Sequence, residues 1–158
     1  MGTNRKTRKQ KHGPNTRENY LAVHRSTLEN YSVYAVNYPA YDEKITSDTL
    51  SLKTSFEVRT FGGHLVGISI AKVAKVTQKK GRAFCKTINY SYLAYDPAPP
   101  RRNLIGYHAP HPHLTDRDAR HHPYHHKHNY ILDKIELLRG EGDIPFVSEF
   151  LDEVLENL

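Results

Sequence analysis

Histidines are concentrated in one short segment of this chain. Residues 120 to 128 read RHHPYHHKH and hold five of the eleven histidines, together with an arginine, a lysine and a tyrosine. Imidazoles titrate near neutral pH and also bind transition metals, while arginine and lysine attract anions. The segment therefore suits four kinds of role: a metal site, a set of proton-transfer groups, a surface for an acidic polymer, or an exposed polar loop.

Metal binding is the first of these roles. His126 and His128 are two residues apart and would share one face of a strand. Zinc sites often add cysteine or carboxylate ligands, and residues 104 to 130 offer only Asp116 and Asp118. Neither an H-E-x-x-H nor a paired C-x-x-C pattern occurs. The pattern predicts no cofactor and assigns no metal ligand, and a metal ion at the histidine cluster stays an open alternative.

Proton transfer is the second role. Two imidazoles can serve as base and acid at neutral pH, and neighbouring cations stabilise developing negative charge. Metal-free RNA cleavage needs this combination, because a base must take the 2′-hydroxyl proton and an acid must protonate the departing 5′-oxygen. We predict His126 and His128 as the proton-transfer pair, with Tyr107 and His111 orienting the reacting groups.

Basic residues near this segment are candidates for phosphate contact. In an extended chain Lys127 points away from the face shared by His126 and His128, so it would anchor a phosphate or the protein itself. A proline-rich loop at residues 96 to 103 adds a pair of arginines. The predicted nucleic-acid contacts are Arg101, Arg102, Arg120 and Lys127.

Charge is distributed unevenly along the chain. The net charge is +6, but residues 1 to 132 hold 21 Lys/Arg against 9 Asp/Glu, while residues 133 to 158 hold eight acids against two basic residues. A basic body attracts phosphate-rich partners. Residues 1 to 16 have almost no apolar content, so we expect a disordered basic arm there and a single domain over residues 17 to 158.

Cysteine content and hydropathy bear on the compartment. The only cysteine is Cys85, so an internal disulfide is excluded and a reducing compartment is the simple interpretation. No apolar run approaches the roughly 20 residues that span a bilayer. We expect a cytoplasmic protein without a membrane partner.

Strand patterns dominate the first half of the chain. Four runs are rich in β-branched and aromatic residues and largely alternate, and glycines between them predict hairpins, with Gly81 at positive φ. The segment TRENYLAVHRSTL fits either a helix or a strand. The predicted strands are residues 30–38, 49–61, 64–76 and 83–95.

The second half ends in a helix pattern. A short strand is expected at residues 104–108, the His/Pro-rich loop follows, and residues 129–139 fit a strand or a helix. Apolar residues at helical spacing predict an amphipathic helix over residues 143–158, with Asp143 as cap, Pro145 in the first turn and an acidic outer face. The fold class is therefore α+β: a twisted antiparallel sheet of about four to six strands with this C-terminal helix.

Four motifs follow one another in the second half: NYSYLAYD, LIGYHAPHPH, HHPYHHKH and the terminal amphipathic pattern. This order resembles the TumE family of small toxins from bacterial and archaeal toxin–antitoxin pairs, over about residues 84–158. His108 stands where that family has an Asp-Asn pair. The resemblance implies a toxin-like protein with nucleic acid as target and a DNA-binding antitoxin as partner. The matching residues are Tyr107, Ala109, Pro110 and His111, then His125, His126, Lys127 and His128.

The leading hypothesis is a toxin-like protein that acts on RNA, with a histidine cluster serving as a metal-independent ribonuclease site. The first alternative is a non-enzymatic nucleic-acid or protein-binding module, in which the basic arm supplies affinity. The second is a metal-dependent hydrolase or metal sensor. Whether the protein is an enzyme stays open; the expected partners are RNA or another nucleic acid and a cognate antitoxin.

Overall fold

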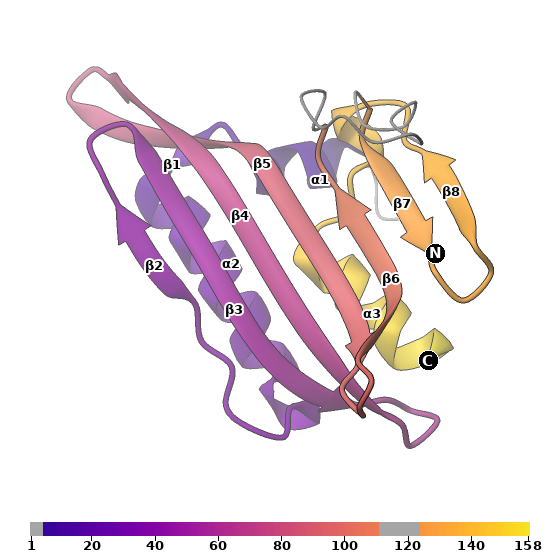
Figure 1. Cartoon of the computed structure of the whole chain (residues 1–158). Coiled ribbons are helices and arrows are strands. Elements are labelled where there is room, and N and C mark those ends of the chain that lie inside the picture. The colour runs from indigo at the N-terminus through magenta and orange to yellow at the C-terminus, as the bar shows by residue number, and fades with distance from the viewer. Residues whose placement is uncertain (1–4, 111–123) are drawn as a thin grey trace.

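The computed structural model describes residues 5–110 and 124–158 and has an α+β architecture, with one antiparallel sheet and helices against one of its faces (Figure 1). The strand order is β2-β3-β4-β5-β6-β7-β8, and β1 pairs with β5. We call the face that packs against the helices the covered face and the other the open face. The helices are α1 (Arg5–His12), α2 (Arg17–Tyr31) and α3 (Val147–Asn157), with 3-10 turns η1 (Ser32–Tyr34) and η3 (Glu141–Asp143). The strands are β1 (Asn15–Thr16), β2 (Asp42–Ile45), β3 (Thr49–Arg59), β4 (Leu65–Lys79), β5 (Arg82–Asp96), β6 (Arg102–His108), β7 (His126–Asn129) and β8 (Lys134–Leu137).

Alternating side chains build the centre of the sheet. In β4 the even-numbered side chains from Val66 to Val76 are buried on the covered face. Strands β3, β4 and β5 confirm the strands predicted over residues 49–95, and tight turns join them. Lys80 and Gly81 both have positive φ, 52° and 74°, which is the backbone that a two-residue hairpin turn requires. The prediction for Gly81 is confirmed.

Helix α3 provides much of the covering layer. Its buried apolar face includes Phe150, whose ring lies 5.5 Å from that of Tyr92 on β5. Burying a side chain of this size stabilises the fold by about 1.5–3 kcal/mol. The helix begins at Val147, where the Glu149 carboxylate accepts the Phe146 N–H at 3.1 Å.

The start of this helix differs from the prediction. Asp143, expected as the cap, lies in η3 and accepts the backbone N–H of Arg139 at 3.2 Å. Pro145 precedes the helix instead of occupying its first turn. Glu149 replaces Asp143 as the capping carboxylate, because residues 144–146 separate Asp143 from the first helical turn.

The sheet has more strands than expected. Seven strands form the main path and β1 joins at β5, against a prediction of four to six. The additional strands are short: β1 has two residues, and β2, β7 and β8 have four each. Runs of this length carry too few alternating positions to be recognised from sequence.

Residues 30–38 are not a strand. Helix α2 continues to Tyr31 and η1 follows, and the segment makes only an isolated bridge between Ala35 and Val58. Val33, Val36 and Tyr38 are 77%, 54% and 72% exposed, so most of the apolar side chains that suggested a strand are not buried in the core. The undecided segment before it is helix α2, capped where the Thr16 hydroxyl accepts the Asn19 N–H.

Most of the expected disordered arm is ordered. Residues 5–16 form α1 and β1, and β1 pairs with Phe84 and Cys85. The arm is held because Arg8 bonds Glu149 and because His12 is buried. The turn between α1 and β1 requires glycine, because Gly13 has φ +95° and a Cβ there would lie 2.2 Å from the Cys85 carbonyl oxygen.

The remaining predictions concern the second half. Strand β6 confirms the short strand, and residues 129–139 form the end of β7, a turn and β8. Residues 111–123, most of the predicted His/Pro-rich loop, lie outside the described residues. Within the described chain, no helix combines the length and apolar character needed to cross a membrane.

Candidate functional site

Three histidines meet on the open face. Strand β6 pairs with β7 so that His108 lies opposite His126, while His128 lies opposite Gly106. The ring centroids are 5.0 Å apart for His126 and His128, 5.4 Å for His108 and His126, and 5.5 Å for His108 and His128. Each ring is therefore close to both others. We call His108, His126 and His128 the open-face histidine cluster.

Neighbouring groups orient two of these rings. His126 Nδ1 lies 2.8 Å from the backbone oxygen of Tyr124; because a carbonyl only accepts, this nitrogen carries the proton in the neutral ring. His108 Nδ1 lies 3.2 Å from the Ser91 hydroxyl on β5. The carbonyl fixes the tautomer of His126, and the hydroxyl of Ser91, which can donate or accept, orients the ring of His108.

Gly106 leaves the space that the rings of His108 and Tyr130 occupy. A Cβ at this position would lie 2.7 Å from His108 Nε2 and 3.3 Å from the ring of Tyr130. Tyr130 in turn stacks on His128, with centroids 4.9 Å apart and planes within 9°. A side chain at position 106 would therefore push both aromatic groups away from the cluster.

Exposure divides the three histidines. His108 and His128 are partly exposed, whereas His126 has 0% of its surface exposed. A bound substrate can therefore reach His108 and His128 directly, whereas His126 is a buried neighbour of both rings.

The open face next to the cluster is flat and basic. His108 lies opposite Ser91, Ser91 opposite Ala71, and Ala71 opposite Lys53, so small side chains separate the cluster from a lysine roughly 14 Å away across three strands. The acids that the strand register places on this face are Asp42 and Glu57. The basic side chains placed there include Lys44, Lys53, Arg59, Lys75, Lys79 and Arg82.

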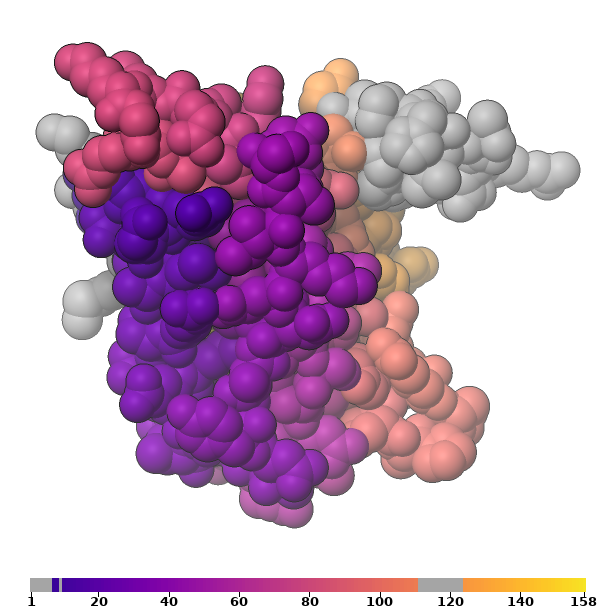
Figure 2. Space-filling model, turned by 90° about the vertical axis from the view of Figure 1, so that its left-hand side faces the viewer, coloured from indigo at the N-terminus to yellow at the C-terminus, as the bar shows by residue number. Residues whose placement is uncertain are grey.

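An aromatic–cation pair lies farther along the same face. The Tyr95 ring covers Gly67, where a Cβ would lie 2.2 Å from a ring carbon. Arg101 stacks on this ring, with its guanidinium carbon 3.6 Å from the centroid. Figure 2 shows the loop between β5 and β6, in salmon, projecting on the side opposite helix α2, in indigo. The pair lies where Tyr95 is opposite Gly67 in the sheet, next to this loop.

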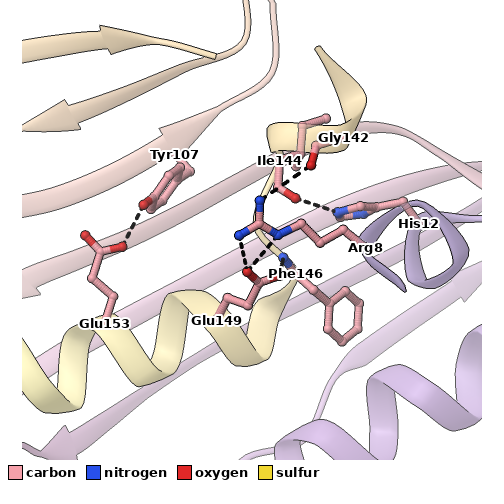
Figure 3. A network of polar contacts seen from close by, with 8 residues as sticks. All are labelled: Arg8, His12, Tyr107, Gly142, Ile144, Phe146, Glu149 and Glu153. Atoms are coloured by element: carbon pink, nitrogen blue, oxygen red, sulfur yellow. Dashed lines mark hydrogen bonds and ion pairs between the residues drawn. The ribbon is translucent and has the colours of Figure 1, made fainter. Parts of the chain in front are cut away.

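The predicted site residues fall in separate places. His126 and His128 come together, but Tyr107 and Lys127 lie on the covered face, where both contact Glu153 of α3; the Tyr107 hydroxyl is 2.6 Å from that carboxylate (Figure 3). The opposite orientation of Lys127, predicted from alternation, is confirmed. Tyr107 therefore cannot orient groups at the histidine cluster, because the sheet separates them.

The other predicted contacts are distant or outside the described chain. Arg101 and Arg102 lie at the start of β6 and His108 at its end, a separation of roughly 20 Å along the strand. His111 and Arg120 lie outside the described residues. Of the predicted residues, only His126 and His128 are brought together on the open face.

Acidic residues line a cleft on the covered side. It has a volume of about 840 Å³ and lies between β8, η3 and α3. Arg8 bonds Glu149 at its wall, beside the Tyr107–Glu153 contact (Figure 3). The carboxylates around it are Glu136, Asp143, Glu149, Asp152, Glu153 and Glu156. The cleft beside α3 is thus lined by more acidic than basic side chains, whereas the strand register places mostly basic side chains on the open face, which a polyanion fits.

A second group of titratable side chains lies buried on the covered face. Lys72 is 1% exposed, and its Nζ lies 2.7 Å from His24 Nε2 and 3.2 Å from His12 Nδ1. The other ring nitrogens face backbone oxygens: His24 Nδ1 is 2.7 Å from Tyr20, and His12 Nε2 is 3.4 Å from Ile144. Both imidazoles therefore donate to a carbonyl and accept from Lys72. We call Lys72, His12 and His24 the buried amine cluster.

Burial controls the charge of this cluster. Loss of solvation lowers the pKa of Lys72 well below its usual value. Burial, followed by repulsion from Lys72, lowers the pKa of His12 to about 3 and that of His24 well below 6.5. At neutral pH His12 and His24 are accordingly neutral imidazoles, and Lys72 beside them lies between the Tyr20 and Phe146 rings.

Sequence reasoning missed four members of these clusters as site residues: His108, His12, His24 and Lys72. His108 was expected only as a departure from a family pattern, and no local signal shows that β6 will pair with β7. Lys72 had a usable signal, because it takes an apolar position in the alternation of β4 between Ile70 and Ala74. A charged residue in that phase predicts a buried polar cluster.

Metal coordination finds no support in the described part of the chain, where no group of three or more His, Cys, Asp or Glu side chains is arranged to hold an ion. Comparison with family models, with curated proteins and with solved structures gives no match. The resemblance to the TumE family therefore stays a prediction. Function is inferred from the side chains and their geometry alone.

Proposed function

We propose that the protein cleaves RNA without a metal ion, using the open-face histidine cluster for proton transfer. The observation that carries this proposal is the mutual approach of three imidazoles, 5.0–5.5 Å between centroids, on the open face of the sheet, where the strand register places mostly basic side chains. Two imidazoles at this spacing can serve one reacting phosphate as base and acid.

Exposure assigns the roles within the cluster. His108 and His128 reach solvent and act as the base and acid, the base accepting the 2′-hydroxyl proton and the acid protonating the departing 5′-oxygen. His126 is buried beside both rings and is a positioning residue, held by its bond to the Tyr124 backbone. This revises the sequence-based pair of His126 and His128.

The surrounding surface suits a single strand of RNA. Small side chains at Ser91, Ala71 and Gly106 leave the sheet flat beside the cluster, and the lysines and arginines of the open face offer contacts to successive phosphates. The Tyr95–Arg101 pair offers a stacking surface for a base.

The cellular setting follows from the resemblance alone. A toxin-like role in the cytoplasm, restrained by an antitoxin protein, is the setting in which an uncontrolled RNA-cleaving surface would need a partner. The acidic cleft beside α3 is available to such a partner, because it lies on the side of the sheet away from the RNA surface.

The test is cleavage of a labelled single-stranded RNA by tag-free protein in EDTA, between pH 5 and 9. We expect product to form and the rate to show a bell-shaped pH profile, since one histidine must be neutral and the other protonated. His108→Ala and His128→Ala should each lower the rate by about 10²–10⁴-fold.

His64→Ala is the matched control, because His64 is exposed in the turn between β3 and β4. It should cleave at the unchanged rate. Intact RNA throughout, with binding that weakens steeply as salt rises, would replace catalysis by the binding-module alternative. Cleavage that EDTA abolishes would replace it by a metal-dependent reaction.

A further inference from the structure

Among the described residues, strand β8 is the outermost strand on its side of the sheet, and it carries exposed apolar side chains. It is the last strand of the path, and within the described chain it pairs only with β7. Ile135 and Leu137 are 46% and 52% exposed, and Ile131 and Leu132 in the preceding turn are 57% and 60% exposed. Edge strands of this kind pair readily with another chain.

The backbone of β8 is oriented for such pairing. The Leu138 N–H donates to the His125 oxygen at 2.8 Å, so Leu138 directs its backbone groups toward β7. In an antiparallel ladder alternate residues bond the same neighbour. The backbone groups of Ile135 and Leu137 therefore point away from β7, toward the outer edge.

We propose that β8 pairs with β8 of a second copy of this chain, antiparallel about a two-fold axis through Ile135. In this register Ile135 of one copy lies opposite Ile135 of the other, and each donates its N–H to the other's carbonyl. Lys134 then lies opposite Glu136 of the second copy, and the reverse. Two pairs of opposite charges thus flank a central apolar pair.

Charge selects this register over its neighbour. Shifting the axis to Glu136 would place two glutamates directly opposite each other, and like charges opposite each other destabilise a strand pair. Shifting it to a point between two residues would place each apolar side chain opposite a charged one on the other face of the sheet. The second copy is therefore the occupant that the charges and the apolar side chains of β8 both fit.

The other edge of the sheet is protected against the same pairing. Strand β2 carries Asp42, Glu43 and Lys44 in four residues, and Glu43 is held by Arg25 of α2 at 2.6 Å. Charged residues at an edge discourage pairing with other chains. The contrast makes β8 the edge that assembles.

Pairing at β8 would join the two histidine clusters on one surface. His128, Ile135, Ile135 of the second copy and its His128 would follow in one row, which is roughly 14 Å for three strand spacings. A two-fold axis normal to the sheet keeps both open faces on the same side. This consequence rests on the proposed RNA cleavage, whereas the dimer itself does not.

Cross-linking tests the register without RNA. Directly opposed residues in an antiparallel pair have Cα atoms about 5.5 Å apart, within disulfide range. Ile135→Cys should therefore form a covalent dimer under mild oxidation, and Leu137→Cys, four positions out of register with itself, should stay monomeric. Cys85 is buried and does not compete.

Charge reversal tests the interface in full-length protein by sedimentation velocity. Lys134→Glu and Glu136→Lys should each weaken dimerisation, by about tenfold for two like-charge pairs, and the double variant should restore it. A monomer at every concentration overturns the proposal. Cross-linking through Leu137→Cys but not Ile135→Cys, or failure of the double variant to restore the dimer, overturns the register.

Discussion

The two histidine clusters lie on opposite faces of one sheet and differ in access. The open-face histidine cluster includes His108 and His128, which reach solvent. In the buried amine cluster His12 and His24 each use both ring nitrogens, one toward a carbonyl and one toward Lys72. Close histidines therefore serve structure on one face and are available for chemistry on the other.

The difference arises from what covers each cluster. Lys72 lies between the rings of Tyr20 and Phe146, so a proton taken up there would place a charge among aromatic side chains without a carboxylate beside Lys72 in the described chain. Burial raises the free energy of the protonated, charged forms, and it therefore lowers the pKa values of His12, His24 and Lys72. Proximity of imidazoles alone thus does not make a reactive site.

The largest expected effect is a loss of stability in mild acid. His12 has a pKa lowered to about 3 and His24 has a lowered pKa, both through burial, while the unfolded chain binds protons near pH 6.5. As pH falls below 6.5, these two histidines therefore bind up to two more protons in the unfolded state than in the folded state, and they lower the free energy of unfolding by up to about 3 kcal/mol per pH unit. Urea unfolding at pH 7, 6 and 5 measures the slope.

The control for this slope is His64→Gln, which removes an exposed histidine and should leave it unchanged. His24→Gln should reduce the slope by about half, since one of the two proton-linked groups is gone. A stability that is flat between pH 7 and 5 would show that the buried imidazoles are not held neutral.

Replacing the buried amine should have the next largest effect. Lys72→Met keeps the apolar stem but removes the donor to His12 and His24, and each buried nitrogen left without its donor costs about 1–3 kcal/mol. We expect a loss of about 2–4 kcal/mol by denaturant unfolding, with RNA cleavage per folded molecule unchanged.

Lys75→Met is the matched control on the same strand, because Lys75 is exposed on the open face. Its effect on stability should stay within about 0.5 kcal/mol. If Lys72→Met were as stable as the parent, the hydrogen bonds from Lys72 would contribute nothing to the fold.

The smallest expected effect is that of Tyr107→Phe, which tests whether the covered face takes part in RNA cleavage. Tyr107→Phe removes the hydroxyl that bonds Glu153, which should cost about 1 kcal/mol of stability. RNA cleavage should be unchanged, because the sheet lies between Tyr107 and the open-face cluster. A loss of cleavage comparable to that of His128→Ala would show that Tyr107 does orient the reacting groups, as the sequence predicted.

Long regular elements could be predicted from local pattern. Strands β3, β4 and β5 and helix α3 have 11 to 15 residues, enough for an alternation or a helical spacing to be read. Residues 30–38 show the limit, since their strand-like composition forms the end of a helix and a bridge. The order of residues 5–16 was missed because it depends on tertiary partners such as Glu149.

The sequence by itself determined the α+β class, the pairing of the central hairpins, the opposite orientation of Lys127 and the concentration of histidines. Tertiary structure alone decided that His108 joins His128 and His126, that Tyr107 lies on the other face, and that Lys72 is enclosed with His12 and His24. The reason is physical: strand register links residues far apart in the chain, and a shift of one residue would turn every side chain to the other face.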